Sequence, residues 1–273
     1  MGKGKLRNKD CECGSGLKGK KCCELILKLS IREIMDRHLN VYDGLVEKIK
    51  SNNKSKAILS IQRNNENMLT LEKKFHNLRS KEENLYAYEP KISKVPLKDV
   101  QAEFVEHQEV FFQGIYSTIS SFVNVINLIA PAKFKQDLSI SSIKKFLNQL
   151  NQKLPGLSNE IKEIEKARDF RAKYVDHIQQ NPIHDWATTS WFDEKGMHST
   201  VIYFIRIKDK DKYNVFFPGV KNLNPYTKDF KPNFECEEYY VPPYYRSVFV
   251  SMKKIINTTI QKISSEDNKI YSR

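Results

Sequence analysis

The chain lacks an uninterrupted stretch of about 20 apolar residues, which is the length that a transmembrane helix needs. Its longest apolar stretch, residues 110–130, is interrupted by the polar side chains of Gln113, Ser117, Ser120, Ser121, Asn124 and Asn127. This pattern predicts a helix buried in a protein core rather than a membrane span. The first 24 residues are basic and cysteine-rich rather than apolar. We therefore expect no signal peptide and a cytoplasmic, reducing location.

Several enzyme signatures are also missing. The sequence contains no glycine-rich phosphate loop, no kinase or hydrolase motif and no internal repeat. Acidic residues are in deficit, with 33 against 46 basic residues and a net charge of +13 over 273 residues. Such a charge favours an anionic partner, which can be RNA, DNA, the ribosome or an anionic membrane surface. The alternative is an ordinary basic protein from a proteome rich in lysine and asparagine.

Cysteine is scarce, but four of the five cysteines lie within 13 residues, and they are Cys11, Cys13, Cys22 and Cys23. Glycines between the two pairs allow a tight turn that brings the four thiols together. Four thiolates suit a closed tetrahedral zinc site with a structural role. Nearby positive charge favours the thiolate form, and it comes from Lys18, Lys20 and Lys21. The alternatives are disulfides, which adjacent cysteines disfavour, or free thiols.

This stretch resembles the SEC-C motif, the metal-binding tail of the translocation ATPase SecA and of many otherwise unrelated bacterial proteins. The matching pattern is Cys-x-Cys-Gly-Ser-Gly, a basic run, and two further cysteines, within residues 8–24. Glu12 and Gly19 depart from the residues that the family often has there, proline and an aromatic residue. The resemblance implies bound zinc and docking on a protein, a ribosome or a nucleic acid.

Apolar periodicity predicts a mainly helical protein. We expect a first helix from Ser30, where Ser30 and Glu33 have the spacing of a capping box, with His38 as a core histidine on its buried face. Residues 51–55 should break the pattern, and residues 62–67 are polar enough for a solvated face. Further helices are expected at residues 56–86, 98–130, 141–154, 158–182 and 247–264.

Strand-like patterns follow Pro182. They predict a small antiparallel meander with strands at residues 186–192, 199–207 and 213–217. A tyrosine cluster could stack on bases or pack against this sheet, and it comprises Tyr239, Tyr240, Tyr244 and Tyr245. We therefore expect three parts: a zinc knuckle at 1–25, a helical bundle at 26–182, and a sheet with a C-terminal helix at 183–273.

Two arginines stand on the apolar face of the helix expected at 158–182. Arg171 lies in the middle of that face and Arg168 lies on it too. A buried arginine is costly unless it is paired or used. It is either a partner in a buried salt bridge or a phosphate ligand, a task for which its planar fork is well suited.

The same helix resembles the HEPN superfamily, helical domains of RNA-cutting toxins and defence proteins. The matching residues are Arg168, Asp169, Arg171, Lys173 and His177, whereas Ala172 stands where many catalytic members have a polar residue. The resemblance spans residues 98–180 and implies a helical bundle, homodimers, and a metal-independent endoribonuclease with Arg171 and His177 as the catalytic pair. On an ideal helix six residues place these two side chains about 120° apart, so they converge only if the helix end distorts or across a dimer.

These patterns lead to two functional hypotheses. The first is a zinc-binding, RNA- or ribosome-associated protein of HEPN-like build with endoribonuclease activity of the toxin or defence type. In it, Arg168 and Lys173, together with the three lysines of the knuckle, would contact nucleic acid. The alternative is a non-enzymatic adaptor that docks on a protein partner through the knuckle.

Overall fold

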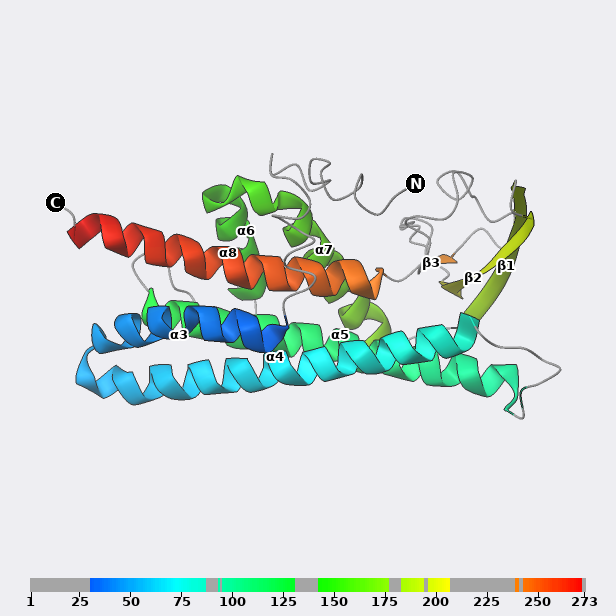
Figure 1. Cartoon of the computed structure of the whole chain (residues 1–273), viewed down its shortest axis with the longest axis horizontal. Helices are drawn as coiled ribbons and strands as arrows, with labels where there is room; N and C mark the ends of the chain where they lie inside the picture. The colour runs from blue at the N-terminus through cyan, green and yellow to red at the C-terminus, as the bar shows by residue number, and fades with distance from the viewer. Residues whose placement is uncertain are drawn as a thin grey trace.

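The computed structural model describes residues 30–86, 93, 95–130, 142–176, 183–193, 196–206, 239–240 and 243–271. The predicted zinc knuckle therefore lies outside the described residues. Within them the protein is mainly α-helical, as expected. The helices are α3 (Ile31–Glu47), α4 (Ser51–Tyr86), α5 (Leu97–Ile129), α6 (Ser142–Lys153), α7 (Ser158–Phe170) and α8 (Tyr245–Tyr271). Helices α3, α4, α5 and α8 run along the long axis of the molecule, and α6 and α7 pack on one side (Figure 1).

Helix α3 begins as its sequence predicts. The Glu33 amide donates to the Ser30 hydroxyl at 3.1 Å, and the Ser30 amide donates to the Glu33 carboxylate at 2.6 Å. This capping box satisfies two backbone donors that the first helical turn would otherwise leave open. The expected break at residues 51–55 is wrong, because α4 already begins at Ser51. Polar residues there occupy the exposed first turn of a helix whose burial begins at Ala57.

Helices α4 and α5 form a long antiparallel hairpin that pairs along most of its length (Figure 1). The two helices approach closely at Gly114, where an added Cβ would lie 2.9 Å from the Leu71 Cδ1 atom. The interpretation of residues 62–67 as a solvated face is wrong for Asn64, which is buried. Its side-chain oxygen accepts a hydrogen bond from the Ser121 hydroxyl at 3.0 Å. A satisfied polar pair of this kind can stand inside a helix–helix contact without a large desolvation cost.

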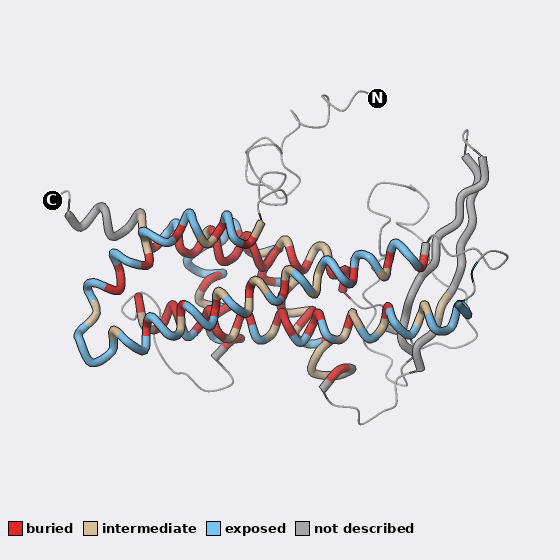
Figure 2. Tube along the Cα trace, turned by 60° about the horizontal axis from the view of Figure 1, so that its bottom comes forward, coloured by how far each residue is buried: buried red, intermediate tan, exposed pale blue. Residues whose placement is uncertain are grey.

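The core lies where the inner faces of these helices meet (Figure 2). Helix α5 contributes many of its residues, as its broad apolar circumference predicts. Helix α8 is enclosed as well, since every residue from 251 to 257 is buried. Two of its buried polar residues bond to neighbouring helices, Asn257 to His38 and Lys254 to Glu160.

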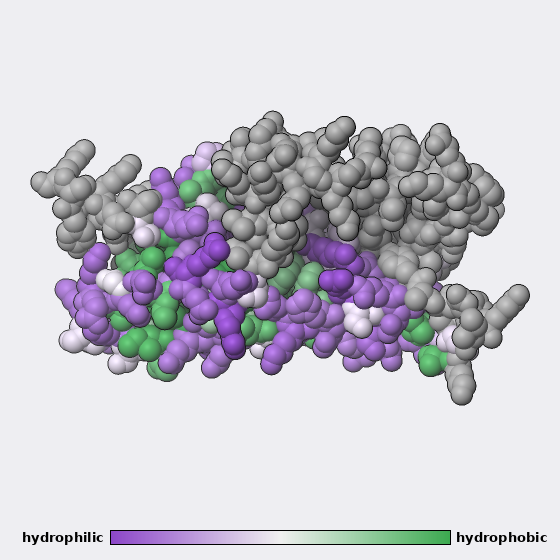
Figure 3. All heavy atoms as spheres, viewed as in Figure 1, coloured by the Kyte–Doolittle hydropathy of each residue, from purple (hydrophilic) through white to green (hydrophobic). Residues whose placement is uncertain are grey.

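The surface of the described part is largely hydrophilic on the face in Figure 3. Apolar side chains gather at the end where α3 leads into α4 (Figure 3). The exposed large apolar residues of these two helices include Leu39, Ile58 and Leu59. No helix within the described ranges is long and apolar enough to cross a membrane.

Strands follow the bundle in the chain. β1 (Ile183–Asp193) pairs with β2 (Gly196–Arg206) in an antiparallel hairpin, at the positions of the first two predicted strands. The strand paired with the other edge of β2 is β3 (Tyr239–Tyr240), while the third predicted strand, 213–217, lies outside the described residues. The Trp186 ring meets the Phe104 ring edge-on at 5.8 Å, so β1 contacts α5.

Candidate functional site

The structure describes only part of the predicted site. Arg168 and Arg171 are placed with their side chains, and Lys173 is placed as backbone only. His177 lies outside the described residues. So do the predicted knuckle residues, which are Cys11, Cys13, Cys22, Cys23, Lys18, Lys20 and Lys21. The described part of the predicted site is therefore the part around Arg168 and Arg171.

The helix that carries these arginines changes pitch at Arg171. Helix α7 ends at Phe170, and a π-helical segment, η3 (Arg171–Asp176), continues the chain. The expectation of one regular helix over 158–182 is therefore wrong at residues 171–176, and residues 177–182 lie outside the described residues. A π-helical turn bonds each amide to the carbonyl five residues back, and such turns are frequent at functional sites. The wider turn changes the positions of residues 172–176 relative to a continued α-helix.

Two consecutive residues at this junction meet aromatic side chains of α5. The Phe170 ring packs edge-on against the Phe112 ring at 4.7 Å, deep in the core. The Arg171 guanidinium carbon lies 3.8 Å from the centre of the Tyr116 ring, and both of these residues are half-buried. Arg171 therefore stands at the rim of the core, on an aromatic face. Such a contact stabilises a cation by about 0.5–1 kcal/mol at an exposed site.

Arg168 is half-buried, with 28% of its side chain exposed. Its Nη2 atom is 2.9 Å from the Asp169 carboxylate, and the Asp169 side chain is 56% exposed. Exposed ion pairs of this kind contribute little to stability. A buried ion pair on α7 is formed by Glu160, whose carboxylate accepts from Lys254 of α8 at 2.5 Å.

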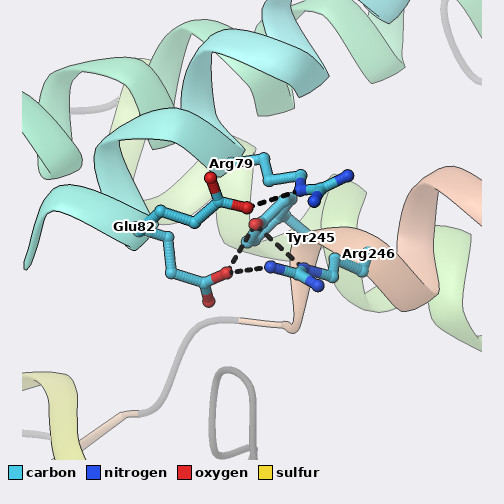
Figure 4. A network of polar contacts seen from close by, with 5 residues as sticks. Arg79, Glu82, Tyr245 and Arg246 are labelled. Atoms are coloured by element: carbon cyan, nitrogen blue, oxygen red, sulfur yellow. Dashed lines mark hydrogen bonds and ion pairs between the residues drawn. The ribbon is translucent and has the colours of Figure 1, made fainter. Parts of the chain in front are cut away.

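A second polar cluster joins α4 to the start of α8 (Figure 4). The buried Glu82 carboxylate accepts from the Tyr245 hydroxyl at 2.7 Å and from Arg246 Nη2 at 2.6 Å. Burial, and then the neighbouring Glu82 charge, raise the pKa of Tyr245 far above its usual range. The expected packing of this tyrosine on the sheet is wrong, because its ring contacts Phe75 and Phe111 of the helices. The signal in the sequence was Glu82 itself, a carboxylate on the same face of its helix as Leu78.

The cluster around Glu82 is internally neutralised and links two helices, so we regard it as structural. The described residues contain no group of three or more histidine, cysteine, aspartate or glutamate side chains that could hold a metal ion. Arg168 and Arg171 place two guanidinium groups where α7 meets η3, each held by a contact. Guanidinium groups are suited to bind a phosphate group.

No family model, no curated protein and no solved structure matches this chain. The resemblances to the SEC-C motif and to the HEPN superfamily therefore depend on the short motifs that carry them.

Proposed function

We propose that this protein binds RNA at the junction of α7 and η3 and carries a structural zinc ion in its N-terminal knuckle. The observation that carries the RNA proposal is the Arg171–Tyr116 stack, which holds a guanidinium at the rim of the core. Arg168 lies three residues earlier in the chain, on α7, and is half-buried as well. Two arginines so spaced can contact neighbouring phosphates of one strand.

Charge supports a polyanion as the ligand. The chain carries a net charge of +13, so association with RNA would be driven largely by the release of counterions. The mainly helical build and the matching residues of α7 and η3 favour a HEPN-like bundle. In the knuckle, Cys11, Cys13, Cys22 and Cys23 would hold the zinc ion, which would order that segment without taking part in chemistry.

The HEPN-like motif around Arg171 supports a second candidate function, a metal-independent endoribonuclease. Arg171 and His177 diverge on an ideal helix, so catalysis would need them to meet through a distorted helix end or across a dimer. His177 would accept the proton of the attacking ribose hydroxyl, and Arg171 would stabilise the negative charge that develops on the phosphorane. A dimer that shares this site would bring further positive charge to the same strand.

Titration of labelled single-stranded RNA at two salt concentrations tests the proposal. We expect binding that weakens steeply with salt, because bound cations are displaced from the RNA. Arg171→Ala should lower the affinity by about tenfold or more, since it removes a charged hydrogen-bond donor. Arg63→Ala, which removes the same charge from an exposed position of α4, is the control and should have a smaller effect.

Cleavage is followed in the same samples with EDTA present. His177→Ala should abolish cleavage and leave binding intact, because it removes a proton acceptor and little positive charge. Equal degradation by the wild type and His177→Ala would assign the activity to a contaminant. If the wild type fails to bind RNA even at low salt, the adaptor hypothesis, with docking through the knuckle, becomes the better one.

A further inference from the structure

Arg171 is held by two successive contacts along one face of α5. Phe170 is anchored in the core against Phe112, and both side chains are almost fully buried. The next residue, Arg171, meets Tyr116, which lies four positions after Phe112 on the same helix. The first contact fixes the backbone at the start of η3, and the second fixes the side chain that leaves it.

The second contact places the guanidinium carbon over the face of the Tyr116 ring. A distance of 3.8 Å from the guanidinium carbon to the ring centre is well inside the limit of about 6 Å for a cation–π contact. A planar guanidinium can lie flat on a ring and still direct donors along its edge, whereas a lysine ammonium cannot. Tyr116 and Arg171 are both half-buried, so their contact lies at the boundary between the core and the surface.

We propose that Tyr116 is the positioning residue for Arg171 and that it presets the guanidinium for a phosphate of single-stranded RNA. This inference depends on the proposed function and adds to it the residue that prepares the site. A free arginine side chain loses many rotamers when it binds a ligand, and that loss weakens affinity. A side chain that is already stacked has lost those rotamers before the ligand arrives.

Arg168 provides the internal comparison. Its guanidinium contacts the exposed Asp169 carboxylate rather than a ring of the core. Tyr116 should therefore act on RNA binding through Arg171 and not through Arg168. A double-mutant cycle can measure this coupling, because residues in contact give non-additive effects and independent residues do not.

The experiment compares Tyr116→Phe with Tyr116→Leu in full-length protein, using labelled single-stranded RNA and fluorescence anisotropy. Tyr116→Phe keeps the ring and should bind as the wild type does. Tyr116→Leu removes the ring and should bind about three- to tenfold more weakly. In an Arg171→Ala background, Tyr116→Leu should have no further effect. If Tyr116→Leu does not fold, Tyr116→Gln replaces it, since a polar chain suits a half-exposed position.

A spectroscopic measurement separates positioning from simple packing. The ring current of Tyr116 should shift the side-chain NMR signals of Arg171 in the wild type and in Tyr116→Phe, and the shift should disappear in Tyr116→Leu. RNA binding that is equal in the wild type and Arg171→Ala would overturn the proposed function of this site. Binding that needs Arg171 but is unchanged in Tyr116→Leu would overturn the positioning role alone. Additive effects in the cycle would also overturn it, because Tyr116 would then contact RNA by itself.

Discussion

His38 shows how a single polar residue is accommodated inside this bundle. Its side chain lies between α3 and α8, and its Nε2 atom is 2.9 Å from the Asn257 side-chain oxygen. Burial lowers the pKa of His38 below its usual value, and the positive charge of Arg37 lowers it further, while the bond to Asn257 opposes the shift. The neutral imidazole is therefore the form that the folded protein prefers.

This preference predicts a pH dependence of stability. Below the ordinary histidine pKa of about 6.5, the unfolded chain takes up a proton that the folded chain resists. His38 should therefore reduce the free energy of unfolding as the pH falls from 7 towards the lowered pKa of the folded state. Urea unfolding at pH 7, 6 and 5 measures the slope. His38→Gln should flatten it, and His107→Gln, at a half-buried site on α5, serves as the control. An unchanged slope in His38→Gln would contradict the prediction.

At the scale of the elements, α7 and α8 are joined by one buried ion pair. Lys254 Nζ lies 2.5 Å from the Glu160 carboxylate, and both side chains are more than 90% buried. Removal of one partner from such a pair leaves an uncompensated charge in the core, which costs about 3–5 kcal/mol. Replacement of both partners by apolar residues of similar volume is often neutral.

We therefore expect Glu160→Ala to lower the free energy of unfolding by about 3–5 kcal/mol, because Lys254 loses the buried carboxylate that it contacts. The double variant Glu160→Leu, Lys254→Met should recover most of this loss. Circular dichroism at increasing urea concentration measures both. Lys166→Ala disrupts the more exposed pair with Glu163 and should cost less than about 1 kcal/mol. A similarly small loss for Glu160→Ala would show that solvent reaches the α7–α8 contact.

At the scale of the whole molecule, the apolar core runs continuously through α3, α4, α5, α6, α7 and α8. Among the described residues, which start at residue 30, the first member of this core is Ile31. A core of this extent does not need a metal ion to supply its folding free energy, whereas a segment as short and polar as the knuckle does.

The knuckle should therefore behave as an appendage. Protein purified without chelator should contain one zinc ion per chain, bound at Zn–S distances of about 2.3 Å. Cys22→Ser should lose the zinc and leave the melting temperature of the bundle unchanged. Cys236→Ser changes the fifth cysteine, which lies outside the knuckle motif, and should alter neither the zinc content nor the melting temperature. Elemental analysis and calorimetry measure these outcomes. A protein without metal would refute the zinc site, and a large fall in melting temperature would show that the knuckle is part of the core.

Local features of this chain could be determined from the sequence alone. The capping box of Ser30 and Glu33, the apolar faces of the helices and the first two strands depend on residues that are neighbours or that repeat with a regular period. The burial of His38 followed from its position in the helical stripe. Such signals involve one element at a time, so the rest of the fold is not needed to interpret them.

Only the tertiary structure decided which elements meet and what each polar residue contacts. Glu82 and Tyr245 are 163 positions apart, and Asn64 and Ser121 are 57 positions apart. The stack of Arg171 on Tyr116 likewise depends on how α5 is rotated about its axis and on where α7 gives way to η3. The sequence was compatible with two roles for Arg171, a partner in a buried salt bridge or a ligand of a phosphate group. Its neighbour was set by helix packing, because the rotation and separation of two helices depend on all the side chains between them.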